Sequence, residues 1–295
     1  MSGRPMVRRT VTAAAAVLLA GAAACASPSP VPPPERGGIG LTAAELEAFL
    51  GNGLRFTGHG DFGLDLALLV PDPDRPGGTA LRVAYPTGSA SRDAGGPDGG
   101  MQAYLELPGG PVEALDLVYR VRFPPGFDFV KGGKLPGLYG GTVTGGREIP
   151  DGTDGFSTRY MWRAGGAGEV YAYLPTSREH GTSLGRGCWW FVPGQWTEIH
   201  QRVLLNSPDA ADGRVLVWQD GRQVLDATGL RFRTTGELRI DGLFFSTFFG
   251  GSDSTWASPV DQYADFAGFR LASVPGPPPP AGGTGPAACD SGAKR

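Results

Sequence analysis

Histidine and cysteine are scarce in this sequence, which limits the metal and redox chemistry that it can support. The 295 residues include only three histidines, His59, His180 and His200, which are far apart and lack the spacing of metal ligands. Asp151 and Asp154 raise the alternative of a calcium site, but the turn-forming role of Asp-Gly explains both. The sequence therefore predicts no metal and no organic or redox cofactor.

Charged residues are also few, and their balance excludes some partners. They make up 19% of the chain, and the formal net charge is −3. Residues 1–26 contain Arg4, Arg8 and Arg9 but no acid, so the remainder carries −6. A protein with this charge is a poor partner for nucleic acid or an anionic membrane. A polyanionic substrate would have to bind at a local basic site.

The N-terminal apolar run is too short to span a bilayer. "VTAAAAVLLAGAAA" follows basic residues and precedes a small-residue cleavage site around Cys25, so residues 1–26 read as an export signal. The "AAAC" that ends at Cys25 also resembles a lipobox, which would make Cys25 a lipid anchor. Residues 27–40 form a Pro-rich linker. We therefore expect a secreted or extracytoplasmic protein, with a cell-surface lipoprotein as the alternative.

The two cysteines other than Cys25 form a candidate disulfide. Cys188 lies in the predicted domain, and Cys289 lies in the Pro/Gly-rich tail at 273–295. An even number of cysteines in an oxidising compartment favours a Cys188–Cys289 bridge over two unrelated thiols. Such a bridge would close a loop of about 100 residues and stabilise the fold by on the order of 4–5 kcal/mol.

Helical patterns are nearly absent beyond residue 50. The segment "LTAAELEAFL" (41–50) predicts one short helix, because Thr42 and Glu45 make a capping box. Strand patterns with Gly-rich turns then run to residue 272, and Asp220-Gly221 predicts a hairpin. This pattern predicts an all-β fold, a β-jelly-roll sandwich with a short N-terminal helix, over residues 41–272. The clearest strands are expected at 114–123, 156–163, 169–174, 196–205, 214–225, 237–251 and 263–272.

One segment, "FSTRYMWRAGGAGEVYAYLP" (156–175), predicts two paired strands whose two faces differ chemically. Alternate residues of a strand share a face, so the apolar set would point into the core. The opposite face is expected to be exposed and to carry the polar set. This set consists of Ser157, Arg159, Met161, Arg163, Tyr171 and Tyr173.

The loop between these strands determines whether their polar sets meet. A five-residue loop at 164–168 would pair Arg163 with Glu169 and place Arg159 opposite Tyr173. Directly opposed residues point to the same side of a sheet, so this register gathers the polar set on one face. A slip of one residue would separate the two strands' contributions.

A serine, an arginine and two tyrosines on one face suit β-elimination in a uronic-acid polymer. The proton beside the carboxylate becomes acidic only if a cation neutralises the carboxylate charge. A tyrosine could take that proton and protonate the leaving oxygen, provided that neighbouring cations lower its pKa from about 10. The loop "KGGKLPG" offers Lys131 or Lys134 as a second cation. Ordinary surface side chains on a strand are the alternative interpretation.

Four segments in this order resemble the polysaccharide lyase family 14 domain: "FVKGGKLPGLYGG", "FSTRYMWR", "EVYAYLP" and "FFSTFFGGSD". The resemblance runs from about residue 54 to 272. It implies a β-jelly-roll and a lyase that acts on alginate or a glucuronate polymer. The catalytic residues that it implies are Lys134, with Lys131 as the second candidate, Ser157, Arg159, Tyr171 and Tyr173.

Each of these residues has an expected role in elimination. Lys134 and Arg159 would neutralise the uronate carboxylate, and Ser157 would support the geometry by a hydrogen bond. Tyr173 or Tyr171 would act as base and acid; in D-mannuronate and D-glucuronate polymers one tyrosine could do both, because proton and leaving oxygen lie on the same side. Predicted substrate-binding residues around the groove are Lys131, Arg163, Arg178, His180 and Arg186.

Two other functions fit parts of the sequence. A glycoside hydrolase would need two facing carboxylates, but Glu169 and Asp241 are isolated. A non-catalytic carbohydrate-binding sandwich would use aromatic surfaces for stacking. Most of the tryptophans considered for that role are expected to lie in the core: Trp189, Trp190, Trp196, Trp218 and Trp256.

Overall fold

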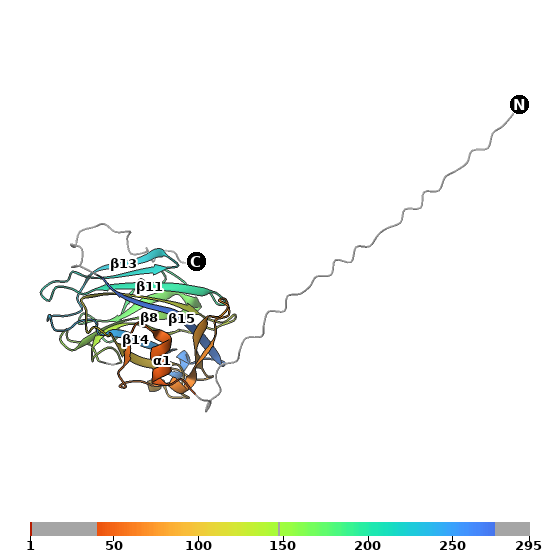
Figure 1. The fold of residues 1–295 in the computed structure, drawn as a ribbon, viewed down its shortest axis with the longest axis horizontal. Coiled ribbons are helices and arrows are strands. Elements are labelled where there is room, and N and C mark those ends of the chain that lie inside the picture. Colours follow the sequence, from red (N-terminus) through yellow and green to blue (C-terminus); the bar gives the residue numbers. More distant parts are fainter. Residues whose placement is uncertain (2–39, 147, 275–295) are drawn as a thin grey trace. The chain divides into compact units, whose positions relative to one another are not determined.

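The computed structural model describes residues 1, 40–146 and 148–274, and these form a sandwich of two antiparallel β-sheets with one short α-helix (Figure 1). The all-β prediction is confirmed. The predicted export signal, Cys25, nearly all of the linker, Cys289 and most of the tail lie outside the described residues. Within the described residues, no helix is long and apolar enough to cross a membrane.

The first sheet, here called the front sheet, contains eight strands within the described residues. Most of them pair in the order β1-β4-β14-β6-β8-β9-β10, and β7 pairs with β14 and β8. The strands are β1 (Arg55–Phe56), β4 (Met101–Glu106), β6 (Gly132–Leu135), β7 (Gly137–Gly141), β8 (Gly155–Arg163), β9 (Gly168–Tyr173), β10 (Thr182–Leu184) and β14 (Gly242–Phe249).

The second sheet, here called the back sheet, contains seven strands within the described residues, in the order β13-β12-β11-β5-β15-β3-β2. They are β2 (Ala67–Pro71), β3 (Thr79–Tyr85), β5 (Ala114–Arg122), β11 (Trp196–Leu204), β12 (Gly213–Gln219), β13 (Arg222–Leu230) and β15 (Gln262–Ser273). In β5 buried and half-buried residues alternate, as expected for a strand with one face on the core.

The predicted helix and hairpin are both confirmed. In α1 (Ala43–Leu50), Thr42 accepts a hydrogen bond from the backbone of Glu45, whose side chain accepts one from Thr42 in return. Asp220 and Gly221 join β12 to β13 with φ angles of 49° and 77°. Two consecutive positive φ angles define the type I′ turn, whose twist matches that of paired strands.

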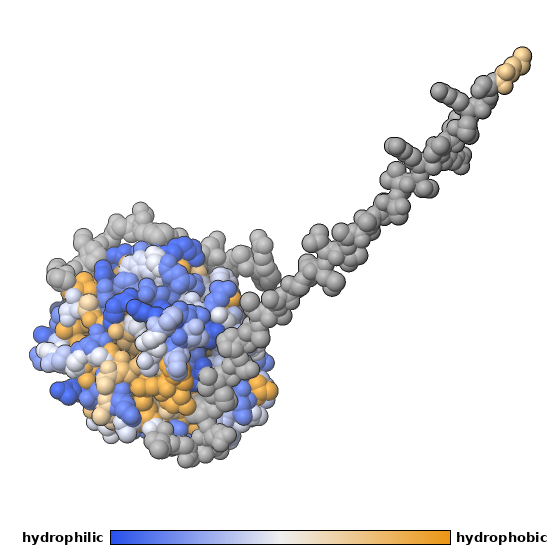
Figure 2. All heavy atoms as spheres, turned by 45° about the vertical axis from the view of Figure 1, so that its right-hand side comes forward, coloured by the Kyte–Doolittle hydropathy of each residue, from blue (hydrophilic) through white to orange (hydrophobic). Residues whose placement is uncertain are grey.

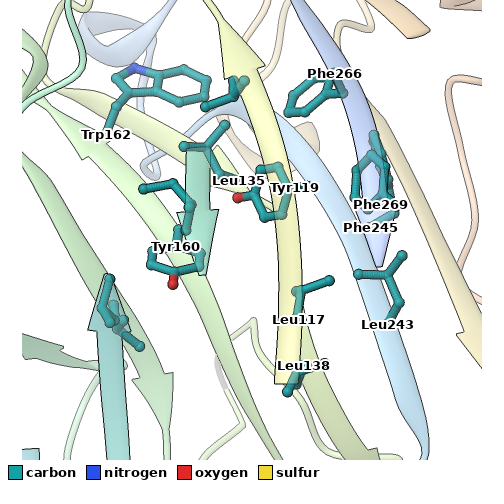
Figure 3. Packing of buried hydrophobic residues seen from close by; sticks show 14 of the residues in the cluster. Leu117, Tyr119, Leu135, Leu138, Tyr160, Trp162, Leu243, Phe245, Phe266 and Phe269 are labelled. Carbon is teal, nitrogen blue, oxygen red and sulfur yellow. The ribbon is translucent and has the colours of Figure 1, made fainter. Parts of the chain in front are cut away.

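Large aromatic and aliphatic side chains fill the space between the sheets (Figure 3). Tyr160 and Trp162, on the apolar face of β8, are fully buried there, as predicted. Full burial of such side chains supplies the main stabilising free energy of the sandwich. The prediction that most of the five tryptophans named for stacking lie in the core holds in part, because Trp196 and Trp218 pack against smaller core clusters without being fully buried. Trp189 is buried, but Trp190 is 53% exposed, and Trp196, Trp218 and Trp256 are half-buried.

The surface mixes hydrophilic residues with smaller hydrophobic areas on the face shown in Figure 2. Among the described residues other than Met1, four large hydrophobic side chains are exposed: Leu69, Trp190, Val192 and Val260. Scattered exposed side chains of this kind are normal for a folded protein and need no partner.

The register predicted for β8 and β9 is wrong by two residues. Arg159 lies opposite Tyr171, and Ser157 lies opposite Tyr173. Because side chains alternate with a period of two, a shift of two leaves every residue on its predicted face. The gathering of the polar set on one face is therefore confirmed, although the pairs within it differ.

The tighter turn between these strands explains the shift. The amide of Arg163 donates to the carbonyl of Ala167 at 2.7 Å, so the connection closes within fewer residues than the predicted loop at 164–168. Gly165 and Gly166 adopt φ angles of 67° and 82°, which other residues rarely adopt. Consecutive glycines allow this short turn.

Candidate active site

The predicted catalytic residues lie on the face of the front sheet that points away from the core, here called the site face. Ser157 and Arg159 come from β8, and Tyr171 and Tyr173 come from β9. Lys134 of β6 pairs with Met161 of β8, next to Arg159 on the same face. Strand pairing thus brings together residues from three strands.

The site face is not exposed at this point, contrary to the prediction. Ser157 is 0% exposed, Arg159 and Tyr173 are each 4% exposed, and Lys134 is 9% exposed. Met161 and Tyr171 lie against Lys134. Residues 142–146, in the connection between β7 and β8, lie against Ser157, Arg159 and Tyr173. We call this segment the crossing loop.

Backbone carbonyls of the crossing loop accept hydrogen bonds from the predicted catalytic residues. Ser157 Oγ donates to Thr144 O at 2.5 Å, and Arg159 Nη2 approaches the same oxygen at 3.5 Å. The hydroxyl of Tyr173 donates to Gly146 O at 2.8 Å. From the other side, the Tyr104 hydroxyl lies 2.6 Å from Thr144 Oγ1. The loop therefore places oxygens against the polar side chains of Ser157, Arg159 and Tyr173.

The guanidinium of Arg159 is held over β14. Its Nη1 donates to Ser246 Oγ at 3.2 Å, and its central carbon lies 4.5 Å from the ring centroid of Phe244. The buried Nε has no hydrogen-bond partner among the described residues. Burial lowers the pKa of Arg159 from its usual value. An arginine stays charged even when burial lowers its pKa. The Nε of Arg159 is therefore a charged donor without an acceptor.

Lys134 is a buried amine without a carboxylate partner among the described residues. Its Nζ lies 3.2 Å from Met161 Sδ and 4.5 Å from the ring centroid of Tyr171. Burial, together with the positive charges of Arg159 and Arg163, lowers the pKa of Lys134 well below its usual value. Lys134 therefore loses its proton at a lower pH than a surface lysine does.

The two tyrosines contact each other edge to face, with ring centroids 5.6 Å apart. Burial and the neighbouring Tyr173 raise the pKa of Tyr171 to about 12. Tyr171 therefore keeps its proton at neutral pH, which suits a proton donor. The expected lowering of a tyrosine pKa by cations is not observed for Tyr171, because burial outweighs Arg163.

Glu169 neutralises the other cations at the edge of this site. It is fully buried and accepts from Arg163 Nε at 2.8 Å and from Arg186 Nε at 2.6 Å. These two arginines are thus paired within the protein, whereas Lys134 and Arg159 are not. The two basic groups without a carboxylate partner, Lys134 and Arg159, therefore lie next to the tyrosines.

The remaining predicted substrate-binding residues lie at the periphery. Lys131 is exposed and donates to Thr255 Oγ1 at 2.5 Å, away from Lys134. Arg178 and His180 are exposed in the connection between β9 and β10. Next to His180, Gly181 packs against the rings of both tyrosines, so this connection borders the site. Of the two candidate lysines, Lys134 is the one that lies against Tyr171 and Met161.

No group of three or more His, Cys, Asp or Glu side chains in the described part of the chain is placed to hold a metal ion. Asp151 Oδ1 accepts from the backbone amide of Thr153 at 2.7 Å, which is a turn contact.

Sequence reasoning missed three residues that shape the site, namely Tyr104, Phe244 and Ser246. Phe244 and Ser246 alternate in "LFFSTFFGG", and that alternation indicates that they share one face of a strand. Nothing in the sequence indicates that this face meets Arg159, because the two strands lie far apart in the chain.

The chain matches one protein family by sequence. The family model Polysaccharide lyase 14 matches residues 73–269. The family match and the two-sheet β-sandwich define the protein as a polysaccharide lyase. The chain belongs to polysaccharide lyase family 14. No curated protein sequence matches it.

Solved structures of similar proteins support this placement. A PL-14 alginate lyase from Aplysia kurodai is 32% identical, with a TM-score of 0.68 over 80% of this chain and 97% of that chain. The alginate lyase Aly36B is 23% identical, with a TM-score of 0.65 over 80% and 92% of the two chains. The alginate lyase vAL-1 from Chlorella virus is 22% identical, with a TM-score of 0.62 over 70% and 89%. The last two show likeness of fold alone.

Proposed function

We propose that this lyase cleaves a uronate-containing polysaccharide, alginate or a glucuronate polymer, by β-elimination. The observation that carries the proposal is the buried guanidinium of Arg159, which has no carboxylate partner and an Nε without a hydrogen-bond partner among the described residues, beside the buried amine of Lys134. A buried charge without a partner is costly, and a uronate carboxylate would supply the missing negative charge. The similarity to the Aplysia alginate lyase supports the same class of substrate.

Arg159 is the group that neutralises the carboxylate. Its Nε is free to donate, and Ser246 and Phe244 fix its orientation. A planar guanidinium can bind both carboxylate oxygens, and its charge stabilises the enolate that forms after proton removal. Ser157 lies beside it and can exchange its bond to Thr144 O for one to the substrate.

The pKa shifts favour two different residues as base and acid, whereas the sequence predicted a tyrosine for both roles. Lys134 is more readily neutral than an ordinary lysine, so it suits the base that removes the proton beside the carboxylate. Tyr171, with a pKa of about 12, suits the acid that protonates the leaving oxygen. Tyr173 lies between the crossing loop and Tyr171 and is the alternative base.

The pH dependence of the rate tests this division. The rate should rise with pH as Lys134 loses its proton and fall only in strongly alkaline solution, as Tyr171 ionises near 12. Tyr173→Phe should slow the reaction without moving the acidic limb. An acidic limb that disappears in Tyr173→Phe would assign the base to Tyr173 instead.

The function itself is tested by following the ultraviolet absorbance of a new conjugated double bond. The purified protein is mixed with alginate, mannuronate-rich blocks, a glucuronate polymer and a neutral glucan. Rising absorbance on a uronate polymer, lost in Arg159→Ala, is expected. New reducing ends without absorbance would indicate a hydrolase. Retention on polysaccharide without any cleavage would indicate a binding module.

Export is part of the proposal and rests on the pattern of residues 1–26. Expression of the full chain should place activity outside the cytoplasm. If Cys25 carries a lipid, Cys25→Ser should move activity from the cell surface to the medium. Activity that stays in the cytoplasm would contradict the export signal.

A further inference from the structure

An exposed arginine lies above the site face at a distance from the catalytic residues. Arg92 begins η2 (Arg92–Ala94), in the connection between β3 and β4, and makes no ion pair within the described residues. Its guanidinium carbon lies 5.6 Å from the ring centroid of Phe62. Asp93 follows it in sequence, but no ion pair joins the two side chains. Arg92 is thus a further cation whose charge the protein does not neutralise.

Phe62 lies on the site face. It forms an antiparallel bridge with Gln102, which lies opposite Ser246 on β14. Directly opposed residues share a face, and Ser246 contacts Arg159. Phe62 is half-buried, so part of its ring is open to solvent above the sheet.

A second half-buried ring connects Phe62 to the catalytic lysine. Phe248 lies 5.9 Å from Phe62 between ring centroids, and it pairs directly with Lys134. Gly100 leaves the space for this ring, because a Cβ at that position would lie 2.7 Å from the Cβ of Phe248. The aromatic pair therefore extends from Lys134 toward Arg92.

The connection that carries Arg92 is tied to the end of β14. Ser91 Oγ donates to the carbonyl of Gly251, two residues beyond the last residue of that strand. This contact holds the base of η2 beside the site face. Arg92 is therefore attached to a fixed position, which lowers the entropy cost of binding a ligand there.

We propose that Arg92, Phe62 and Phe248 form a binding subsite for a second uronate unit, beside the unit whose carboxylate Arg159 binds. The inference rests on the proposed function, because a uronate polymer presents a carboxylate and an apolar ring face on each unit. The phenyl rings fit the sugar face, and the guanidinium fits the carboxylate. A neutral glucan has no carboxylate and would lack the contact with the Arg92 guanidinium.

This subsite contributes to binding and not to bond cleavage, since no atom of Arg92 contacts the catalytic residues. Arg92→Ala should therefore raise KM for a long uronate polymer about tenfold, the loss of one charge-assisted contact, with kcat nearly unchanged. Arg92→Lys keeps the charge but loses the planar guanidinium that can donate two parallel hydrogen bonds to a carboxylate. Its KM should therefore lie between those of Arg92→Ala and the unsubstituted protein. Phe62→Leu should also raise KM.

Arg75→Ala is the matched control. Arg75 is also exposed and without an ion pair in the described part of the chain, but it lies between β2 and β3 of the back sheet. The rates of all variants are measured over a range of polymer concentrations. A rise in KM for Arg92→Ala but not for Arg75→Ala supports the subsite, particularly if added salt narrows the difference.

Two results would overturn the subsite alone: equal KM values for Arg92→Ala and Arg75→Ala, or a loss confined to kcat. Both leave the lyase activity of the unsubstituted protein intact. Absence of unsaturated product from every uronate polymer with the unsubstituted protein would instead overturn the proposed function, and the subsite with it.

Discussion

The candidate site contains two buried basic side chains that have no carboxylate partner among the described residues. Glu169 pairs with Arg163 and Arg186 and leaves Lys134 and Arg159 without a carboxylate. Such an arrangement lowers the stability of the free protein and stabilises an anionic ligand once it is bound. At the scale of single residues, a substitution in this site should therefore lower activity without lowering stability.

Lys134→Met should abolish activity and raise stability. The charged amine is disfavoured by burial and by two arginines, so removing it removes an unfavourable contribution at neutral pH. The free energy of unfolding at pH 7, from urea denaturation, should increase by roughly 0.5–2 kcal/mol. Arg75→Ala, on the surface, should change neither quantity. If Lys134→Met lowers the free energy of unfolding instead, the packing of the lysine side chain stabilises the protein by more than its desolvation destabilises it.

Ser246→Ala should slow catalysis through Arg159. The serine hydroxyl accepts from Arg159 Nη1 at 3.2 Å, and without it the guanidinium loses one of the contacts that orient it. We expect kcat to fall about tenfold, a cost typical of one lost buried hydrogen bond, with little change in melting temperature. Ser246→Thr keeps the hydroxyl and should restore part of the rate.

Ser273→Ala, at the exposed end of β15, is the control for this substitution. If Ser246→Ala lowers the melting temperature but leaves kcat unchanged, the serine is a structural residue of β14 and does not position Arg159.

At the scale of elements, the crossing loop 142–146 determines access to the site. It is the first part of the connection from β7 to β8, and it places backbone oxygens against Ser157, Arg159 and Tyr173. These contacts occupy the hydroxyls of Ser157 and Tyr173 in the free protein, whereas Arg159 Nε has no partner among the described residues. The loop therefore influences the same groups that the substrate must reach.

Gly145→Ala should lower kcat/KM more than tenfold. A Cβ at this position would lie 2.3 Å from Arg159 Nη2, so either the guanidinium or the loop must move. The atom that yields is the end of the Arg159 side chain, and a small displacement of this proposed catalytic group should lower the rate strongly. Activity and melting temperature are measured together, and only activity should change strongly.

Gly236→Ala is the matched control, since no atom lies within 4 Å of its added Cβ. The prediction is contradicted if Gly145→Ala and Gly236→Ala are equally active, which would mean that Arg159 tolerates displacement.

At the scale of the whole molecule, ion pairs on the outer face of the back sheet couple stability to pH. Arg202 donates to both oxygens of Asp116, at 2.6 and 2.7 Å, and His200 lies 3.2 Å from the same carboxylate. Burial acts to raise the pKa of Asp116, but the hydrogen bonds from Arg202 and the nearby His200 outweigh it and lower the pKa to about 2.

Asp116→Asn should therefore destabilise the protein in a pH-dependent way. The folded-state pKa is depressed, so the contribution of Asp116 is present above its ordinary value of 3.8 and is lost as the pH falls toward about 2. Urea denaturation of both proteins at pH 7, 4 and roughly 2 measures the difference. A difference that persists undiminished at the lowest pH would show that the substitution acts through packing instead.

Local signals in the sequence predicted much of this architecture. The capping box at Thr42 and the Asp220-Gly221 turn specify α1 and a hairpin through contacts between near neighbours. The alternation in β8 and β9 predicted the shared face of the catalytic set even though the register was displaced by two residues. A pattern with a period of two survives that error, because a displacement by two preserves both faces.

The sequence by itself determined the class of fold, the polar face of two neighbouring strands and the residues that resemble a lyase. Only the tertiary structure decided that Ser246 and Phe244 orient Arg159, that the crossing loop lies against the site and that Arg92 lies over Phe62. These contacts join segments far apart in the chain, and several use backbone carbonyls, which every residue has. Their positions depend on packing between strands, and no local pattern of side chains encodes that packing.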